Sequence, residues 1–351
     1  MNAPDTTPDL PDRIADEAQL DEFLSRPTPE VIGAVGRLDG DLAIIGGGGK
    51  IGPSLARMAC RARAESKWTG QVIVVDRFPD AAARAALESA GARTVVADLL
   101  DPAAVSALPP AGNVIYMVGM KFGTSDNPSL TWAINALPPA YVVARYSGAR
   151  LVTFSTGCVY EFVPAASDGS VENDPLTPIG EYANACIARE RIFEYAAARA
   201  ATPMVQVRLN YAIEMRYGVL VDLATTIAAG QPVDVTMGWF NCIWQGDVNA
   251  AVLRLLAHAT SPPLALNLTG PEKLSVRGVA NRLSERMGRE VRFTGTEAQT
   301  ALLSDASKAF DLLGKPPTPI GRVIDWTADW IARGAATLGK PTHFQQRDGK
   351  Y

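Results

Sequence analysis

The stretch Asp41-Leu-Ala-Ile-Ile-Gly-Gly-Gly-Gly-Lys-Ile-Gly-Pro-Ser-Leu-Ala-Arg-Met58 decides the fold of this chain. It begins with apolar residues, continues through a run of glycines, and then repeats apolar residues at helical spacing. The pattern predicts a strand, a tight turn and a helix. Gly46, Gly49 and Gly52 suit the turn itself, the close approach of a phosphate, and the packing of the helix on the strand.

This glycine turn predicts a dinucleotide site, because free amides at the start of a helix attract a pyrophosphate. A phosphate loop of the nucleotide-hydrolase type is excluded, since Ile51 stands where a Ser or Thr would hold magnesium. The next strand, Gln71-Val-Ile-Val-Val-Asp76, ends in an acid near the usual spacing of about 20 residues after the turn. A flexible loop is the alternative, but the order strand, turn, helix, strand and acid favours a cofactor site.

Composition excludes several classes of protein. The 351 residues are 47% hydrophobic and 20% charged, with a net charge of −4, so we expect about two domains and neither nucleic acid nor membrane as a partner. The four cysteines lack metal-ligand spacing, and His258 and His343 are the only histidines. We therefore expect no metal, no histidine-centred catalysis, and a cytoplasmic location.

The remaining chain alternates strands and helices, which predicts an α/β fold with a Rossmann-type doubly wound parallel sheet. Strands are expected at 93–97, 113–118, 150–155 and 204–207, and helices at 79–90, 101–108, 127–146 and 180–200. We assign 1–37 to an N-terminal extension, 38–210 to the Rossmann domain, to which 235–260 returns, and 211–351 to a smaller mixed substrate domain and tail. Because Asp76, Asp98, Lys121 and Thr156 follow strand ends, we expect them to line one crevice.

Residues 41 to 314 resemble the extended short-chain dehydrogenase/reductase family, and within it the NAD-dependent epimerase/dehydratase group. The glycine turn resembles the family's G-x-x-G-x-x-G, and Phe154-Ser-Thr-Gly-Cys-Val-Tyr160 resembles its Ser-Ser-x-x-Val-Tyr-Gly segment. Further matching positions are Asp76, Asp98-Leu99, Asn135, Arg208-Leu-Asn-Tyr211, Asp247, Ser275, Asp305-Ala-Ser-Lys308 and Leu313-Gly314.

The resemblance implies NAD as the cofactor. NADP is less favoured because the Asp76 carboxylate would repel a 2′-phosphate, although Arg77 beside it could meet one. The implied cofactor-binding residues are Gly46, Gly49, Lys50, Ile51, Gly52, Asp76, Arg77, Asp98, Leu99, Val118, Gly119 and Tyr182.

The resemblance also implies a small carbohydrate-derived substrate, namely a sugar, a sugar acid or a nucleotide sugar. Arg208, Arg216 and Arg277 could meet its carboxylate or phosphate, or could equally be solvated or ion-paired. We further expect a homodimer.

The chain departs from the family in its active site, where Tyr182-Ala-Asn-Ala-Cys186 replaces Tyr-x-x-x-Lys. In the family that lysine lowers the pKa of the tyrosine and holds the nicotinamide ribose, and Cys186 can do neither. We predict that Lys121 supplies the missing cation, the alternative being a solvated surface lysine. We expect Arg189 to face away from Cys186, and Cys186 not to act as a nucleophile.

Two functions therefore remain open. In one, Tyr182 and Thr156, which takes the place of the family's catalytic serine, polarise a substrate hydroxyl or carbonyl for hydride transfer. In the other, the protein is a catalytically impaired NAD-binding scaffold or regulator.

Overall fold

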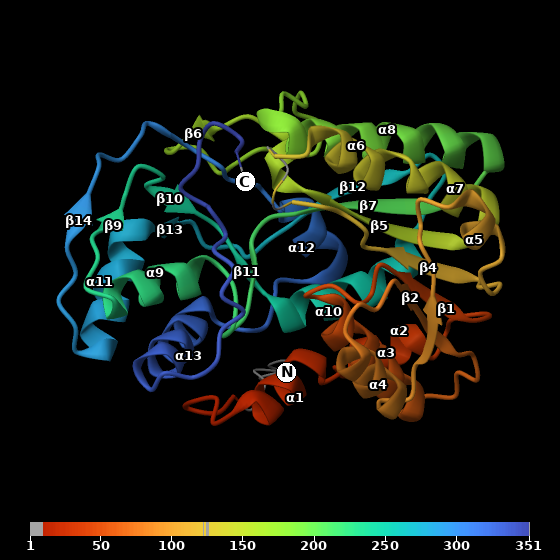
Figure 1. Ribbon diagram of the computed structural model, residues 1–351, viewed down its shortest axis with the longest axis horizontal. Coiled ribbons are helices and arrows are strands. Elements are labelled where there is room, and N and C mark those ends of the chain that lie inside the picture. The colour runs from red at the N-terminus through yellow and green to blue at the C-terminus, as the bar shows by residue number, and fades with distance from the viewer. Residues whose placement is uncertain (1–9, 122, 124–125, 351) are drawn as a thin grey trace, which may run out of the picture.

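A computed structural model describes residues 10–121, 123 and 126–350 of the chain. Its larger lobe is built on a seven-stranded parallel sheet in the order β12-β7-β5-β4-β1-β2-β3 (Figure 1). The strands are β1 (Leu42–Ile45), β2 (Val72–Asp76), β3 (Arg93–Val96), β4 (Asn113–Tyr116), β5 (Arg150–Thr156), β7 (Met204–Leu209) and β12 (Leu264–Leu268). This confirms the predicted Rossmann-type fold.

Helices cover both faces of the sheet, because its strands are apolar on both sides. Leu42 and Ile44 face one core, which α2 (Pro29–Val35), α3 (Gly52–Ala64) and α10 (Gln245–Leu255) complete. Ala43 and Ile45 face the other core, which α5 (Pro102–Ser106), α7 (Pro138–Arg145) and α8 (Gly180–Ala200) complete. Helix α6 (Pro128–Ala136) lies beside α8, and α4 (Ala81–Ser89) packs on β3 (Figure 1).

One predicted helix is wrong. The single helix expected over 127–146 is divided into α6 and α7 at Leu137. Pro138 and Pro139 follow at once, and a proline lacks the N–H that would continue the ladder and restricts the residue before it. Both prolines can begin a helix, so the chain starts again as α7.

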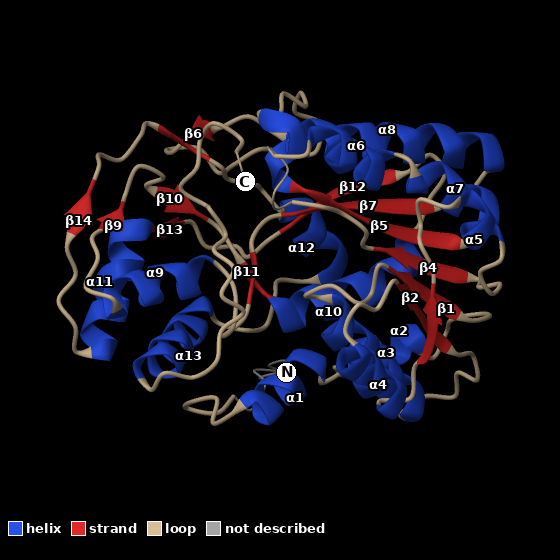
Figure 2. Ribbon diagram, viewed as in Figure 1, coloured by secondary structure: helices blue, strands red, loops and turns tan. Residues whose placement is uncertain are grey.

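The smaller lobe has helices and only short strand pairs, as Figure 2 shows. Its helices α9 (Val219–Ala228), α11 (Val276–Met287) and α13 (Ile320–Ala332) share one apolar core. The pairs are β8 (Ala212–Ile213) with β11 (Ile243–Trp244), β9 (Val233–Asp234) with β14 (Phe293–Thr294), β10 (Trp239–Phe240) with β13 (Leu274–Ser275), and β6 (Val163–Pro164) with β15 (Thr300–Ala301). Helix α12 (Ser307–Leu313) packs on β12.

The chain returns to the large lobe in two pieces. Helix α10, inside the segment 235–260 that we expected to return, packs on one core of the sheet, and edge strand β12, beyond that segment, pairs with β7 in parallel register. The short apolar run Leu264–Leu268 carried no signal of its own that distinguishes a sheet edge from a small-lobe strand. The domain boundaries otherwise stay a prediction.

The N-terminal extension packs on both lobes: α1 (Glu17–Ser25) lies against α3 and α10, and Ile14, Leu20 and Leu24 join the core of the small lobe. Residues 1–9 lie outside the described residues. In α1, Asp21 accepts from Arg57 Nη1 at 2.5 Å, and Glu22 accepts from Arg61 Nη1 at 2.6 Å. Asn249 of α10 donates to the Leu24 carbonyl at 2.9 Å. None of the helices within the described ranges is both long and apolar enough for a membrane span.

Candidate active site

The glycine turn joins β1 to α3 and cannot carry side chains at two of its key positions. Gly46 has a φ of +82°, and a Cβ there would lie 2.7 Å from a Val118 methyl group. A Cβ at Gly52 would overlap the backbone carbonyl of Gly47. At Gly49, by contrast, a Cβ would make only an ordinary contact. Close packing thus explains two of the three glycines.

Asp76 ends β2 directly beside this turn. Its Oδ2 accepts from the Gly48 amide at 2.9 Å, and a Cβ on Gly48 would lie 2.8 Å from the Asp76 carboxyl carbon. Its Oδ1 accepts from the Arg77 amide at 2.7 Å. A tight amide-lined turn with an acid at the next strand end fits the pyrophosphate and ribose of a dinucleotide.

The adenine-side and nicotinamide-side residues follow the ends of β3 and β4. Asp98 is exposed and Leu99 is buried, in the segment after β3. Val118 packs against Gly46, and Gly119 is exposed beside it. Because all these strands are parallel, the two segments lie at the same edge of the sheet as the turn.

Lys50 projects from the turn toward the small lobe. Its ammonium lies 2.8 Å from the centroid of the Tyr217 ring. Burial, with the charges of Lys121 and Lys340, lowers the pKa of the Lys50 ammonium to about 7, although the side chain stays exposed to solvent. The charges of Glu214 and Asp222 act on Lys50 in the opposite sense, so groups of both signs surround this ammonium.

Tyr182 lies at the start of α8, partly buried, where it packs with Cys158 and Tyr211. Helix α8 packs on the short turn Gly157–Val159, which follows β5, and the Thr156 hydroxyl caps that turn by accepting from the Cys158 amide at 3.2 Å. The structure thus brings Tyr182 to the turn that Thr156 begins.

The C-terminal tail reaches the same helix. It returns from α13 between the two lobes to the start of α8 (Figure 1). Gly349 and Gly180 lie so close that a Cβ on either would overlap the backbone of the other. The C-terminal tail therefore packs against the start of α8 from outside the Rossmann sheet. Sequence patterns predicted no role for this tail.

The cation beside Cys186 is the main correction. Arg189, which we expected to face elsewhere, donates from Nη2 to the Cys186 sulfur at 3.1 Å. That expectation was wrong because Cys186 and Arg189 are three residues apart, and side chains at that spacing are neighbours on a helix surface. The reason given for an inert Cys186 also changes: burial raises the pKa of its thiol, and Arg189 opposes this.

Burial also raises the pKa of Tyr182 well above its ordinary value; Cys186 adds to this rise and Arg189 opposes it. The phenol is therefore protonated at neutral pH. The charge of Lys121 acts on Lys50 and Asp222. That Lys121 supplies the cation for Tyr182 stays a prediction.

The three arginines considered as substrate contacts all hold ion pairs. Arg208 is buried and binds Glu190 at 2.8 Å, Arg216 binds Asp21 at 3.1 Å, and Arg277 Nη2 binds Glu297 at 2.8 Å. Each of the three arginines is therefore ion-paired within the protein, which was the alternative to a substrate contact.

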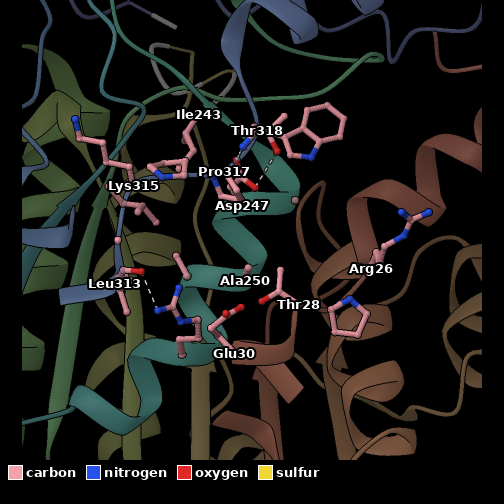
Figure 3. Close-up of a pocket in the computed structure, with 18 of the residues that line it drawn as sticks. Arg26, Thr28, Glu30, Ile243, Asp247, Ala250, Leu313, Lys315, Pro317 and Thr318 are labelled. Atoms are coloured by element: carbon pink, nitrogen blue, oxygen red, sulfur yellow. Dashed lines mark hydrogen bonds between the residues drawn. The ribbon is translucent and has the colours of Figure 1, made fainter. Parts of the chain in front are cut away.

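A cavity of about 680 Å³ lies between the extension, α10 and the loop 313–318 (Figure 3). It contains none of the predicted site residues. Its polar groups bind one another: Asp247, whose pKa burial raises to about 7, accepts from the Thr318 hydroxyl at 3.0 Å, and Arg254 donates to the Leu313 carbonyl at 2.8 Å. These bonds fasten the loop to α10, which is a structural role. Among the described residues, no group of three potential ligands could hold a metal ion.

Comparison with known proteins identifies the same architecture. The model of the NAD dependent epimerase/dehydratase family matches residues 42–268. UDP-glucose 4-epimerase from Thermus thermophilus, solved with NAD, aligns with a TM-score of 0.69 at 20% identity over 84% of this chain and 100% of that one. The dTDP-glucose 4,6-dehydratase of Streptomyces venezuelae, solved with NAD and TYD, gives 0.71 at 17% identity over 84% and 97%. UDP-glucuronic acid 4-epimerase from Bacillus cereus, also with NAD, gives 0.69 at 16% over 84% and 99%. A comparison with curated protein sequences finds no match.

Proposed function

This chain belongs to the NAD-dependent epimerase/dehydratase family, and from this premise we propose that it is an NAD-dependent oxidoreductase acting on a nucleotide sugar by hydride transfer. The observation that carries the proposal is the position of Tyr182. It stands at the start of α8, against the turn that Thr156 begins, at the sheet edge that also holds the glycine turn. A hydroxyl-bearing pair next to a dinucleotide turn suits the polarisation of a substrate oxygen.

In this proposal the backbone of Gly46–Gly52 holds the pyrophosphate of NAD, with Asp76 on the adenosine ribose and Asp98 and Leu99 at the adenine. Bound NAD supplies the hydride acceptor. In the oxidising direction the ionised Tyr182 oxygen would take the proton of the substrate hydroxyl as the hydride leaves the substrate carbon. In the reducing direction the Tyr182 phenol, the form present at neutral pH, would return that proton, and Thr156 would hold the substrate oxygen from the other side. Val118 and Gly119 bound the reacting end.

The positive charge near the glycine turn supports a phosphorylated substrate. The charges of Lys121 and Lys340 act on Lys50, and positive groups near each other favour the binding of an anion. The structural neighbours UDP-glucose 4-epimerase and dTDP-glucose 4,6-dehydratase are named for nucleotide sugars, which carry phosphate groups.

The test is turnover. We expect the purified protein, given NAD, to convert at least one member of a panel of UDP- and dTDP-sugars, detected by NMR of the sugar product. Binding of NAD without conversion of any member would favour the second candidate.

That second candidate, an NAD-binding scaffold or regulator, is favoured by two observations. Cys186 stands in place of the family lysine, and burial keeps the pKa of Tyr182 high. A scaffold would bind NAD, and Tyr182→Phe would leave its activity as a scaffold unchanged.

We predict that NAD binds at least about tenfold more tightly than NADP, a difference of ~1.4 kcal/mol. The Asp76 carboxylate, held by the Gly48 amide, would repel a 2′-phosphate. Calorimetric titration with both dinucleotides measures this ratio. Asp76→Asn should narrow it, and tighter binding of NADP by the unaltered protein would contradict the assignment.

We predict an unusual pH dependence. Because the pKa of Tyr182 is raised, its base form grows about tenfold per pH unit without reaching a plateau between about pH 7 and about pH 10. Oxidation of the substrate, which needs that base, should therefore accelerate over the whole range, whereas carbonyl reduction, which needs the phenol, should stay flat. The measurement is kcat/KM in both directions; a plateau near neutral pH in the oxidising direction would contradict it.

We also propose a homodimer that pairs through α6 and α8. These neighbouring helices leave apolar side chains exposed, among them Trp132 at 39%, Leu137 at 47% and Tyr195 at 65%. We predict that analytical ultracentrifugation shows a dimer and that Leu137→Glu with Tyr195→Glu gives a monomer. Val96→Glu, equally exposed but on edge strand β3, is the matched control and should remain dimeric. A monomer before substitution would contradict the proposal.

We also propose a cytoplasmic location. Free thiols are typical of a reducing compartment, and all four cysteines are free and buried.

A further inference from the structure

Arg189 is a buried cation without a carboxylate partner at ion-pair distance among the described residues. Its side chain lies on α8 and is only 4% exposed. Its guanidinium donates to three neutral acceptors: the Val118 carbonyl at 2.6 Å, Asn135 Oδ1 at 3.2 Å and the Cys186 sulfur at 3.1 Å. Its Nε is buried with no partner in the described part of the chain. Since burying a charge without a counter-charge is costly, such an arrangement calls for a functional reason.

The one carboxylate whose charge acts on Arg189, Glu190, is already paired with Arg208. Arg189 is bonded to Cys186, and Tyr182 packs beside Cys186 and Cys158. The charge of Arg189 lowers the pKa of the Tyr182 phenol, against the rise that burial causes. Negative charge that develops on the Tyr182 oxygen is therefore met by a fixed cation, in a site from which water is largely excluded.

Arg189 also holds the backbone that bounds the reacting end of the cofactor. The Nη1 atom that binds the Val118 carbonyl would lie 2.9 Å from a Cβ on Gly119. Asn135 braces the same segment by donating to the Met120 carbonyl at 3.1 Å and, within α6, to the Thr131 carbonyl at 2.8 Å. One guanidinium thus links α8, α6 and the segment after β4.

The small side chain of Cys186 leaves room for this arrangement. Cys186 and Arg189 are three residues apart on α8, so they are neighbours on its surface. A lysine at 186 would place a second cation against the guanidinium. From this geometry we propose that Arg189 is the active-site cation of this protein: a positioning residue that acts on Tyr182 beside Cys186 and fixes the Val118–Gly119 segment. This inference rests on the proposed function.

The test compares five variants by kcat/KM for substrate oxidation, its pH profile, and NAD affinity. Arg189→Met should lower kcat/KM at neutral pH by at least about tenfold, because loss of the Arg189 charge raises the pKa of Tyr182 further and leaves less of its base form. Arg189→Lys should retain most of the rate. Arg191→Met, on the same helix but exposed and paired with Glu194, is the matched control and should match the unaltered protein.

The decisive variant moves the cation from position 189 to position 186. Cys186→Lys combined with Arg189→Met should recover at least about tenfold of the lost rate, which a merely structural role for Arg189 does not predict. A readout without cofactor accompanies it: Arg189→Met should speed amide hydrogen exchange in residues 117–121, and Arg191→Met should not.

The outcomes distinguish failure of this inference from failure of the proposed function. An unchanged rate and pH profile in Arg189→Met, while Tyr182→Phe is inactive, would overturn the inference and leave the proposed function standing. Full activity in Tyr182→Phe would instead overturn the proposed function. If Arg189→Met does not fold, Arg189→Lys and the double variant decide, and a folded double variant that recovers no rate counts against the inference.

Discussion

Replacing Tyr182 with phenylalanine is expected to lower kcat by about 10²–10⁴-fold, the range for removal of a general acid or base. The phenol is the group at the start of α8 that can exchange a proton with the substrate, and its partners Cys158 and Cys186 are buried thiols. The ring would remain, so packing against Tyr211 and the turn after β5 should be kept. Steady-state kinetics on the best sugar of the panel measures the effect.

Affinity for NAD is the internal control of this experiment. The glycine turn and Asp76 lie on β1 and β2, apart from α8, so calorimetry should give a dissociation constant within about threefold of the original, less than ~0.7 kcal/mol. A large loss of NAD binding would mean that the hydroxyl holds the cofactor rather than the substrate. Unchanged turnover would remove Tyr182 from the mechanism.

Arg208→Met is expected to destabilise the fold by about 3–5 kcal/mol. Arg208 and Glu190 are a buried ion pair at 2.8 Å, with side chains 4% and 2% exposed. Arg208 also donates to the Tyr160 hydroxyl at 2.8 Å and to the Glu172 carbonyl at 2.9 Å. Methionine fills similar space but leaves the Glu190 carboxylate buried without its cation.

Urea unfolding measures this loss, with Arg277→Met as the matched control. Arg277 and Glu297 form a pair of the same chemistry, but their side chains are 42% and 37% exposed. Removal of an exposed pair should cost less than about 1 kcal/mol. Equal losses of unfolding free energy in the two variants would contradict a stabilising role for the buried Arg208–Glu190 pair.

Much of the large lobe could be predicted from sequence because its elements have strong local signals. The glycine turn and Asp76 follow from side-chain size and charge at short spacing, and β1 to β5 follow from apolar runs bounded by turns. The division at Pro138 was also readable from sequence, since two prolines inside a helical pattern predict a boundary. Strand β12 was not assigned to the sheet because its place depends on pairing with β7, far away in the chain.

The site was harder to predict where a side chain's role depends on what it meets across elements. Tyr182 and Thr156 were predicted to share one site because both match positions in the motifs of the family. Arg189 was expected to face away from Cys186, although its spacing of three residues from Cys186 on a helix predicts that the two side chains are neighbours. Its bonds to Val118 and Asn135 join three separate elements, and no local pattern encodes them.

The most direct test of the central claim is a single-turnover measurement with NAD and the panel of UDP- and dTDP-sugars, followed by nicotinamide absorbance. We expect at least one sugar to reduce the nicotinamide in the unaltered protein, and Tyr182→Phe, with NAD bound equally well, to show no such signal on the same timescale. An unaltered protein that binds NAD but gives no reduction with any sugar, and so cannot be distinguished from Tyr182→Phe, would contradict it.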